Sequence, residues 1–571
     1  MAGIDSAPCH CAVAATSTEC AVIVSESSAL DEQQQQAEQP LASFEAQRNQ
    51  VFAMLQPICS VLFRHREDAV QLAKLLNALQ GVVAAAEPAG LQGCLDYVLF
   101  PLLLAVDSIS IVHAADATSE SRKAVPLPAM AAHHAAEAAL ACLAGLLQRT
   151  ACQQPQQLTN LLQHLLAVVM LPPSATPEEL RQLVLMTVGE ALSGVPRAPP
   201  AMHEALCAEE TAPLLGHLIS LLLDAADVEL KAGGTGSKAV RAAALEALLS
   251  LLEALGSPPW ASPGAVADAL SFFLPGLAVG LGRALVAAGG VATAPRGPAA
   301  SSEATVAALR ALTLVLAICL GDSVVPVEDL RPENESPPVT TGSAALQQLR
   351  ELSTRAQAGG RAATTADGNA TAAEHGAVLA ASPVPHSLPK FVDPARMRVE
   401  RNAEWVHGAA SKVEELLSAA LLPLLLHPRP AVRQALVSCC TQLLERCSVA
   451  LGPSAASLLL QLLFSAAQDD WPQVAATARS WLQRHAEEQS ADAGSHIAAV
   501  LPVAEAVEQH LLGLLEQLPS VLRQGDALGR LHALKLTTCF EVSIQSLLML
   551  VLLAGYSFHQ SPCGKNPLIA G

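Results

Sequence analysis

The chain has 571 residues, of which 51% are hydrophobic but only 3% aromatic, and it carries a formal net charge of −19. A core built mainly from leucine, alanine and valine favours closely packed helices over a β-sandwich, whose strands prefer aromatic and β-branched residues. The acidic balance argues against a dedicated nucleic-acid-binding protein, which needs a basic surface to displace the counterions of the phosphate backbone.

The N-terminal segment, residues 1–43, is low in complexity and contains the run Gln33–Gln36. Such a composition cannot bury enough apolar surface to offset the entropy of ordering, so we expect disorder. No basic stretch followed by an apolar core opens the chain, so no secretory signal is indicated. This favours a cytoplasmic location, with the nucleus as a second option.

Helical segments follow one another over residues 44–320. In the first, FEAQRNQVFAMLQPICSVLF, Val51, Ile58 and Leu62 fall on one face at helical spacing. The polar stretch Asp107–Pro128 is predicted to be a loop. Residues 321–389 then change character, being rich in Pro, Gly, Thr and Ala. A loop of that length is rare inside a compact domain, so we expect a flexible, disordered insertion.

The clearest pattern lies in residues 390–535. Two helical runs are separated by His427-Pro428-Arg429-Pro430, a sequence that cannot continue a helix, and a short break at Leu451-Gly452-Pro453 is predicted after the second run. Pro430 and Val432 recur as Pro472 and Val474, an offset of 42 residues (430 to 472). The residues expected to pack the repeats are Trp405, Leu416, Leu424, Val432, Leu436, Leu443, Val474 and Trp481.

A helix–turn–helix unit that recurs every 40–47 residues is typical of HEAT and armadillo repeats. An earlier copy, AVRAAALEALLSLL at Ala239–Leu252, matches AVRQALVSCCTQLL at Ala431–Leu444. An ordinary helical bundle rich in Ala and Leu is the alternative. We predict an all-α solenoid of the HEAT/armadillo type, because period, turn chemistry and the Ala-Val-Arg opening agree.

Two arginines follow valine at the start of inner helices, Arg241 and Arg433. One interpretation is structural: the arginines line up along neighbouring repeats and form hydrogen bonds with groups in the loops. The other is that they are exposed anchors for a partner protein, as arginines often are at interfaces.

A search for catalytic motifs is negative. The sequence has no GxxxxGK[ST], no HExxH and no GxSxG. His133 and Glu137 are four residues apart on a helix, but further metal ligands are not evident. Asp469-Asp470 is better placed to cap a helix than to bind a metal, and Trp405, Trp471 and Trp481 are expected to be packing anchors. No catalytic residue, cofactor or metal ligand is predicted.

The last stretch, residues 536–571, leaves the repeat pattern for a bulky apolar tail. Its uncharged run Val542–Phe558 has 17 residues, and a membrane-spanning helix usually needs about 20 apolar residues. No membrane span is therefore predicted.

Several motifs together resemble one known family. They are VFAMLQPICSVLF, LDYVLFPLLLAV, SKAVRAAALEALLSLL, SFFLPGLAVGL, RNAEWVHGAASKVEELL and HPRPAVRQALVSCCTQLLERCSVAL, in that order. The chain is similar to the Tel-two-interacting protein one family, the HEAT-repeat scaffold subunit of the Triple-T (TTT) co-chaperone complex. The resemblance covers Phe44 to Lys535 outside the insertion. Because members of the family are longer, it suggests that their C-terminal repeats lie outside this sequence.

The resemblance implies a non-enzymatic scaffold. Its expected partners are a Tel-two-like subunit, a second Tel-two-interacting subunit, phosphatidylinositol-3-kinase-related kinases, Hsp90 and the R2TP adaptor, with neither nucleic acid nor membrane among them. Three alternatives stay open: another HEAT adaptor such as a nuclear-transport receptor or phosphatase scaffold, an enzyme with an unrecognised site, and a non-functional fragment.

Overall fold

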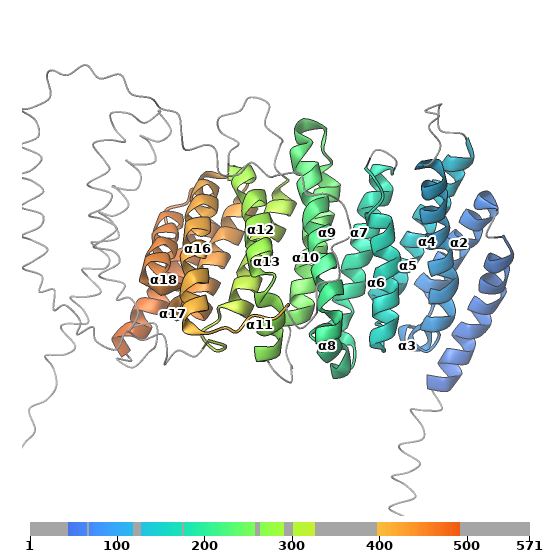
Figure 1. Cartoon of the computed structure of the whole chain (residues 1–571), viewed down its shortest axis with the longest axis horizontal. Coiled ribbons are helices and arrows are strands. Elements are labelled where there is room, and N and C mark those ends of the chain that lie inside the picture. Colours follow the sequence, from blue (N-terminus) through green and yellow to red (C-terminus); the bar gives the residue numbers. More distant parts are fainter. Residues whose placement is uncertain are drawn as a thin grey trace, which may run out of the picture.

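The computed structural model describes residues 44–65, 68–117, 127–173, 176–256, 263–289, 301–325 and 397–491. Every regular element among them is a helix, and the helices stand side by side along the long axis of the molecule (Figure 1). This arrangement of stacked helices confirms the predicted all-α solenoid. The predicted insertion, 321–389, was placed to start too early, because residues 321–325 form an ordered turn bonded to Arg446. The disorder expected for residues 1–43 and 326–389, the predicted repeats over residues 492–535, and the apolar tail 536–571 lie outside the described residues.

The helices form two layers, defined by which neighbours they contact. Layer one holds the helix over residues 44–62, α4 (Leu95–Ala117), α6 (Pro155–Val169), α9 (Ala212–Lys231), α12 (Leu274–Gly289) and α16 (Ala403–Leu421). Layer two holds α2 (Ala69–Ala85), α5 (Leu127–Arg149), α7 (Glu178–Ser193), α10 (Lys238–Gly256), α13 (Ser302–Cys319), the first part of α17 (Pro430–Ala466) and α18 (Pro472–Ala491). Short helices connect the layers, among them α3 (Pro88–Gln92), α8 (Pro200–Leu206) and α11 (Pro263–Ser271).

The array continues across the predicted insertion. Helix α12 packs on α16 in layer one, and α13 packs on α17 in layer two, although residues 326–396 separate the two parts in sequence. The division at 320 and 390 therefore does not interrupt the packing.

Local sequence explains where the helices begin. Pro430 and Pro472 are the first residues of α17 and α18, where a missing amide donor costs least, so the 42-residue offset (430 to 472) relates equivalent positions. Elsewhere side chains accept hydrogen bonds from the first amides: Asp68 from Val70 and Gln71, Ser301 from Ala304, and Asn402 from Trp405.

Helix α17 contains a break at the predicted position. Gly452 has φ of 77°, a left-handed conformation that glycine adopts without strain, and Pro453 follows it. Just before the break, the backbone amide of Asp322 donates to the carbonyl of Arg446 (2.7 Å). The carboxylate of Asp322 accepts from the amides of Val449 (3.2 Å) and Ala450 (3.1 Å). Asp322, which follows α13, thus fixes the backbone of α17 just before its break at Gly452.

Arginines join consecutive repeats of layer two. Arg149, at the end of α5, donates to the carbonyls of Val83 (2.7 Å), Ala84 and Ala86 (2.6 Å), at the end of α2. Arg197 follows α7 and donates in the same way to the carbonyls of Leu147, Gln148 and Thr150 at the end of α5. The last carbonyls of a helix lack partners within it. Each of these arginines therefore satisfies the helix of the preceding repeat.

The core consists of leucine, alanine, valine and cysteine side chains facing between the layers. Three described stretches, Glu209–Lys231, Ser302–Cys319 and Pro430–Ala466, are long and apolar enough to span a membrane by length and composition. In the array, 61% of the Ser302–Cys319 window is buried, and this helix packs against α10, α12 and α17. Burial between the two layers accounts for its hydropathy.

One prediction was wrong in this region. The stretch Asp107–Pro128 is not a loop throughout, because α4 extends to Ala117 and α5 begins at Leu127.

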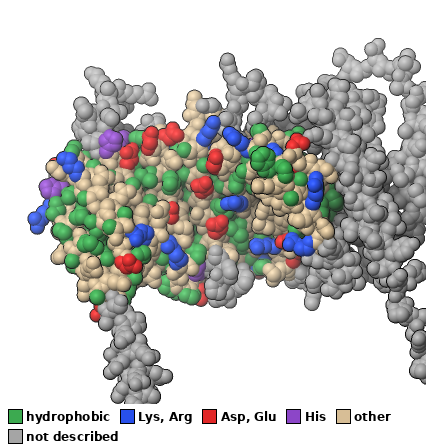
Figure 2. Space-filling model, turned by 180° about the vertical axis from the view of Figure 1, so that it is seen from behind, with side chains coloured by type: hydrophobic (Ala, Val, Ile, Leu, Met, Phe, Trp, Pro, Cys, Tyr) green, Lys and Arg blue, Asp and Glu red, His purple; other side chains and the backbone are tan. Residues whose placement is uncertain are grey.

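On the face seen in Figure 2, acidic, basic and hydrophobic side chains are interspersed, and basic side chains do not gather into one continuous field.

Candidate partner-binding groove

The residues predicted to pack the repeats fall into two groups. Fully buried are Leu424, Val432, Leu436, Leu443, Val474 and Trp481. Trp405 and Leu416 are only partly buried against the core. Leu416 lies over Gly282 of α12, where an added Cβ would come within 2.2 Å of its Cδ1 atom. The glycine thus allows α12 and α16 to approach closely.

The structure places both candidate partner-binding arginines inside the array. Arg433 forms a two-pronged ion pair with Asp469, at 2.6 Å from Nε to Oδ2 and 2.9 Å from Nη2 to Oδ1, and donates to the carbonyl of His427 (2.6 Å). Arg241 is 5% exposed and donates to the carbonyl of Ala284 (3.0 Å). Burial lowers the pKa of Arg241, an effect that Asp227 partly offsets. The geometry favours the structural interpretation of both residues.

Two other predicted features lie on the surface. Trp471 is 48% exposed, so it is not a packing anchor. Asp469 lies two residues before it, and its carboxylate accepts from the Trp471 amide (2.7 Å), in the turn before α18 and not from an amide of the helix itself. On α5 the contact is between His134 and Glu137, three residues apart (3.3 Å), on a solvated face. The part of the chain that the structure describes contains no group of three or more His, Cys, Asp or Glu residues able to bind a metal.

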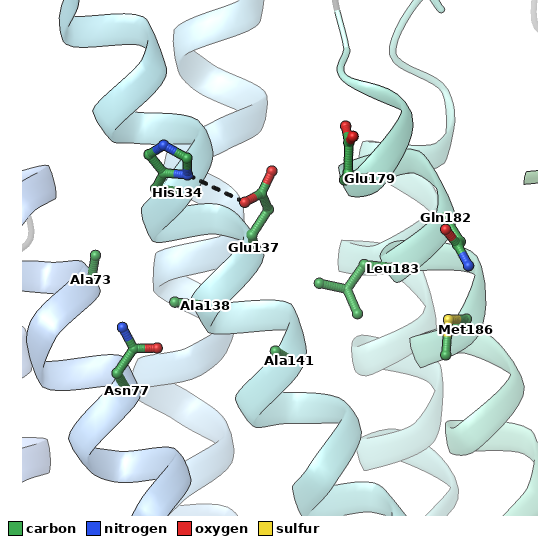
Figure 3. A pocket seen from close by; sticks show the side chains of 10 residues that line it. All are labelled: Ala73, Asn77, His134, Glu137, Ala138, Ala141, Glu179, Gln182, Leu183 and Met186. Carbon is green, nitrogen blue, oxygen red and sulfur yellow. Dashed lines mark hydrogen bonds and ion pairs between the residues drawn. The ribbon is translucent and has the colours of Figure 1, made fainter. Parts of the chain in front are cut away.

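A concavity lies on the outer face of layer two. Its first part, a depression of about 650 Å³, is lined by α2, α5 and α7 (Figure 3). Ala73 and Asn77 come from α2, Ala138 and Ala141 from α5, and Met186 from α7 (Figure 3). The walls carry Glu137 and His134 on α5 and Glu179 on α7.

A second depression, of about 710 Å³, continues from the first. The two share Gln182 and Met186 of α7, so they adjoin at that helix, and we call them together the layer-two groove. Its second part is lined by α7, α10, the start of α13 and the turn before α17. The residues are Gln182, Met186, Lys238, Ala239, Ala242, Ala243, Glu246, Ser301, Ser302, Glu303, His427, Pro428 and Arg429.

Small side chains form much of the groove and carboxylates flank it. Alanines line it on α2, α5 and α10, and the central Met186 is 43% exposed. The carboxylates of Glu179 and Glu246 make no hydrogen bond or ion pair with any other described residue. Hydrogen bonds from its own backbone amide and from the hydroxyls of Ser301 and Ser302 lower the pKa of Glu303, which stays ionised.

The groove is lined by carboxylates, hydroxyls, imidazoles and small apolar side chains. It contains no cysteine, and the cysteines in layer two are buried: burial raises the pKa of the Cys439 thiol to about 11 and that of Cys142 to about 12. A thiol must ionise to act as a nucleophile, so these are inert. Sequence reasoning missed the groove, because it depends on how α5, α7 and α10 align. The only signal was the pattern Ala239, Ala242, Glu246 on one exposed helix face.

Comparison with known proteins places the chain in a family. Among curated proteins no relative matches. Among solved structures, a circular tandem repeat protein with novel repeat topology and enhanced subunit contact surfaces is 13% identical. The similarity covers 90% of this chain and 100% of that one, at a TM-score of 0.23. A TM-score this low does not establish a common fold.

The family model described as the TTI1 N-terminal TPR domain matches residues 52–359 and 369–470, more than half of the chain. TPR, like HEAT, denotes a helix-pair repeat that stacks into an α-solenoid. The chain therefore belongs to the TTI1 family, and the matched residues are its N-terminal helical-repeat region.

Proposed function

We propose that the chain is a non-enzymatic scaffold of the TTT co-chaperone complex, supporting the folding, stability and assembly of phosphatidylinositol-3-kinase-related kinases with Hsp90. The observation that carries the proposal is the family match over residues 52–359 and 369–470. A two-layer array with an open groove and buried, inert thiols is compatible with a protein that works through its surfaces.

The proposed partners are a Tel-two-like subunit, a second Tel-two-interacting subunit, the kinases themselves, and Hsp90 with the R2TP adaptor. A solenoid offers long surfaces on both layers, so several proteins can bind one chain at the same time. A cytoplasmic site of action, extending to the nucleus, follows from this assignment as part of the proposal.

The test is a replacement experiment in cells. The endogenous family member is depleted, the tagged 571-residue chain is expressed, and both its co-precipitating proteins and the steady-state levels of the kinases are measured. Recovery of the Tel-two-like subunit together with restored kinase levels supports the proposal. The negative control is Leu248→Asp, which places a carboxylate at a fully buried position of α10.

A precipitate containing importins or phosphatase subunits, without the Tel-two-like subunit or kinases, would overturn the proposal in favour of another HEAT adaptor. Unchanged kinase levels despite normal expression of the folded chain would likewise contradict it.

A further inference from the structure

We propose that the layer-two groove binds an amphipathic helix of a partner protein, lying across α5, α7 and α10 with basic side chains toward Glu137, Glu179 and Glu246. This inference rests on the proposed scaffold function, because it supposes that the chain binds other proteins. Its test uses none of the TTT components, so the two proposals can fail separately.

The shape of the groove fits a helix. The two depressions, of about 650 and 710 Å³, adjoin at Gln182 and Met186 and together extend over α2, α5, α7, α10 and the start of α13. Alanine residues on α2, α5 and α10 keep the floor low, so a partner backbone can come close. Met186 is the apolar side chain that both depressions share, and its flexible thioether can adapt to the apolar face of a bound helix.

The charges that flank the groove favour a partner helix with positively charged side chains. Glu137, Glu179 and Glu246 project from three consecutive layer-two helices, and the latter two carboxylates have no partner among the described residues. The cations of the groove, Lys238 and Arg429, both belong to its second part. Opposite charge across an interface steers association and fixes register. The carboxylates over α5, α7 and α10 therefore suit lysine or arginine.

The spacing of the helices sets the spacing in the partner. Packed helices lie about 8–10 Å apart, and a helix rises about 1.5 Å per residue. A helix lying across the layer thus meets a new layer-two helix about every five to seven residues. Residues seven apart share one helix face, so the bound face should carry a basic residue about once every seven positions.

The test uses purified full-length chain and two synthetic helical peptides of about 20 residues, sized for three crossings. In the first, lysines recur about every seven residues beside an apolar stripe. The second has the same composition with the lysines moved to the opposite face. Binding is followed by fluorescence anisotropy over a range of salt concentrations. We expect the first peptide to bind more tightly than the second, and binding to weaken as salt rises.

Matched variants identify the surface. The variant Glu137→Gln/Glu179→Gln/Glu246→Gln removes three charges from the groove. The control, Glu400→Gln/Glu404→Gln/Glu415→Gln, removes three exposed charges from α16 and the segment preceding it. Exposed ion pairs each contribute up to a few-fold in affinity. We therefore expect about a tenfold loss for the groove variant and less than about a twofold loss for the control. Circular dichroism verifies that both variants keep the helical fold.

Equal losses in the two variants would show that only net charge matters and would overturn the proposal. No difference between the two peptides would overturn it as well. A wild-type chain that is dimeric in analytical ultracentrifugation, with a monomeric groove variant, would assign the groove to a second copy of the chain instead.

Discussion

The ion pair between Arg433 and Asp469 offers a sharp test of how neighbouring repeats hold together. The Arg433 side chain is 15% exposed and that of Asp469 8%. The pair connects the turn before α17, through the carbonyl of His427, with the turn before α18, through the amide of Trp471. Asp469→Ala would leave a guanidinium group largely buried without its anion.

Removing one partner of a buried ion pair typically costs about 3–5 kcal/mol, because the remaining charge is uncompensated. We expect the lower end, about 3 kcal/mol, since Arg433 keeps its bond to His427. That amount raises the opening equilibrium of α18 about 150-fold. Repeat arrays can unfold locally, so the appropriate assay is native-state hydrogen exchange resolved by segment. The expected result is a loss of protection in α18 with α5 and α7 unchanged.

Two further variants check the reasoning. Arg433→Met/Asp469→Leu replaces both charges with apolar groups and should cost less than Asp469→Ala alone. Arg484→Met removes an exposed pair with Glu445, whose side chains are 61% and 45% exposed, and should cost below about 1 kcal/mol. If Asp469→Ala changed protection of α18 no more than Arg484→Met does, the pair would be screened by solvent and the inference refuted.

Three other predictions concern burial. Trp481→Ala should cost about 3–5 kcal/mol in thermal unfolding, because Trp481 is 5% exposed, and the half-buried Trp405→Ala clearly less; the reverse order would contradict the packing described. Burial raises the pKa of Asp322, so the folded state takes up a proton that the unfolded state does not. The free energy of unfolding of the wild type, measured relative to that of Asp322→Asn, should therefore fall as the pH rises from the pKa of Asp322 in the unfolded chain, about 4, through its higher pKa in the folded protein. A difference between the two proteins that does not change with pH would refute this. Finally, Cys439 and Cys319 should react with a thiol reagent only after unfolding, since burial raises the pKa of Cys319 to about 12; rapid labelling of the native protein would show the opposite.

Sequence reasoning succeeded where local chemistry decides the outcome. The helix starts at Pro430 and Pro472 and the break near Gly452 follow from residues whose backbone preferences are strong. It failed where partners distant in sequence decide. Whether Trp471 is buried depends on what packs around it in the array. The contact of Asp322 with Val449 joins residues 127 apart, which no local pattern indicates.

The candidate site shows the same division. The type of residue on the outer faces of α5, α7 and α10 could be read from the sequence, but the groove arises from the alignment of those helices. The apolar run in α4 indicated a helix, whereas its extension to Ala117 through polar residues did not follow from hydrophobic periodicity. For Arg241 and Arg433, spacing left two interpretations open, and only the positions of Ala284 and Asp469 separate them.

The arginine contacts between successive repeats give the array a polarity. Arg149 completes the end of α2, and Arg197 completes the end of α5, so the carbonyls at these two helix ends are satisfied only when the following repeat is present. Deletion from the C-terminal side therefore exposes unsatisfied carbonyls on the repeat left behind, whereas deletion from the N-terminal side removes only an acceptor. During synthesis, a repeat that has left the ribosome becomes complete when its successor emerges. For these first repeats, folding that proceeds from the N-terminus matches this order.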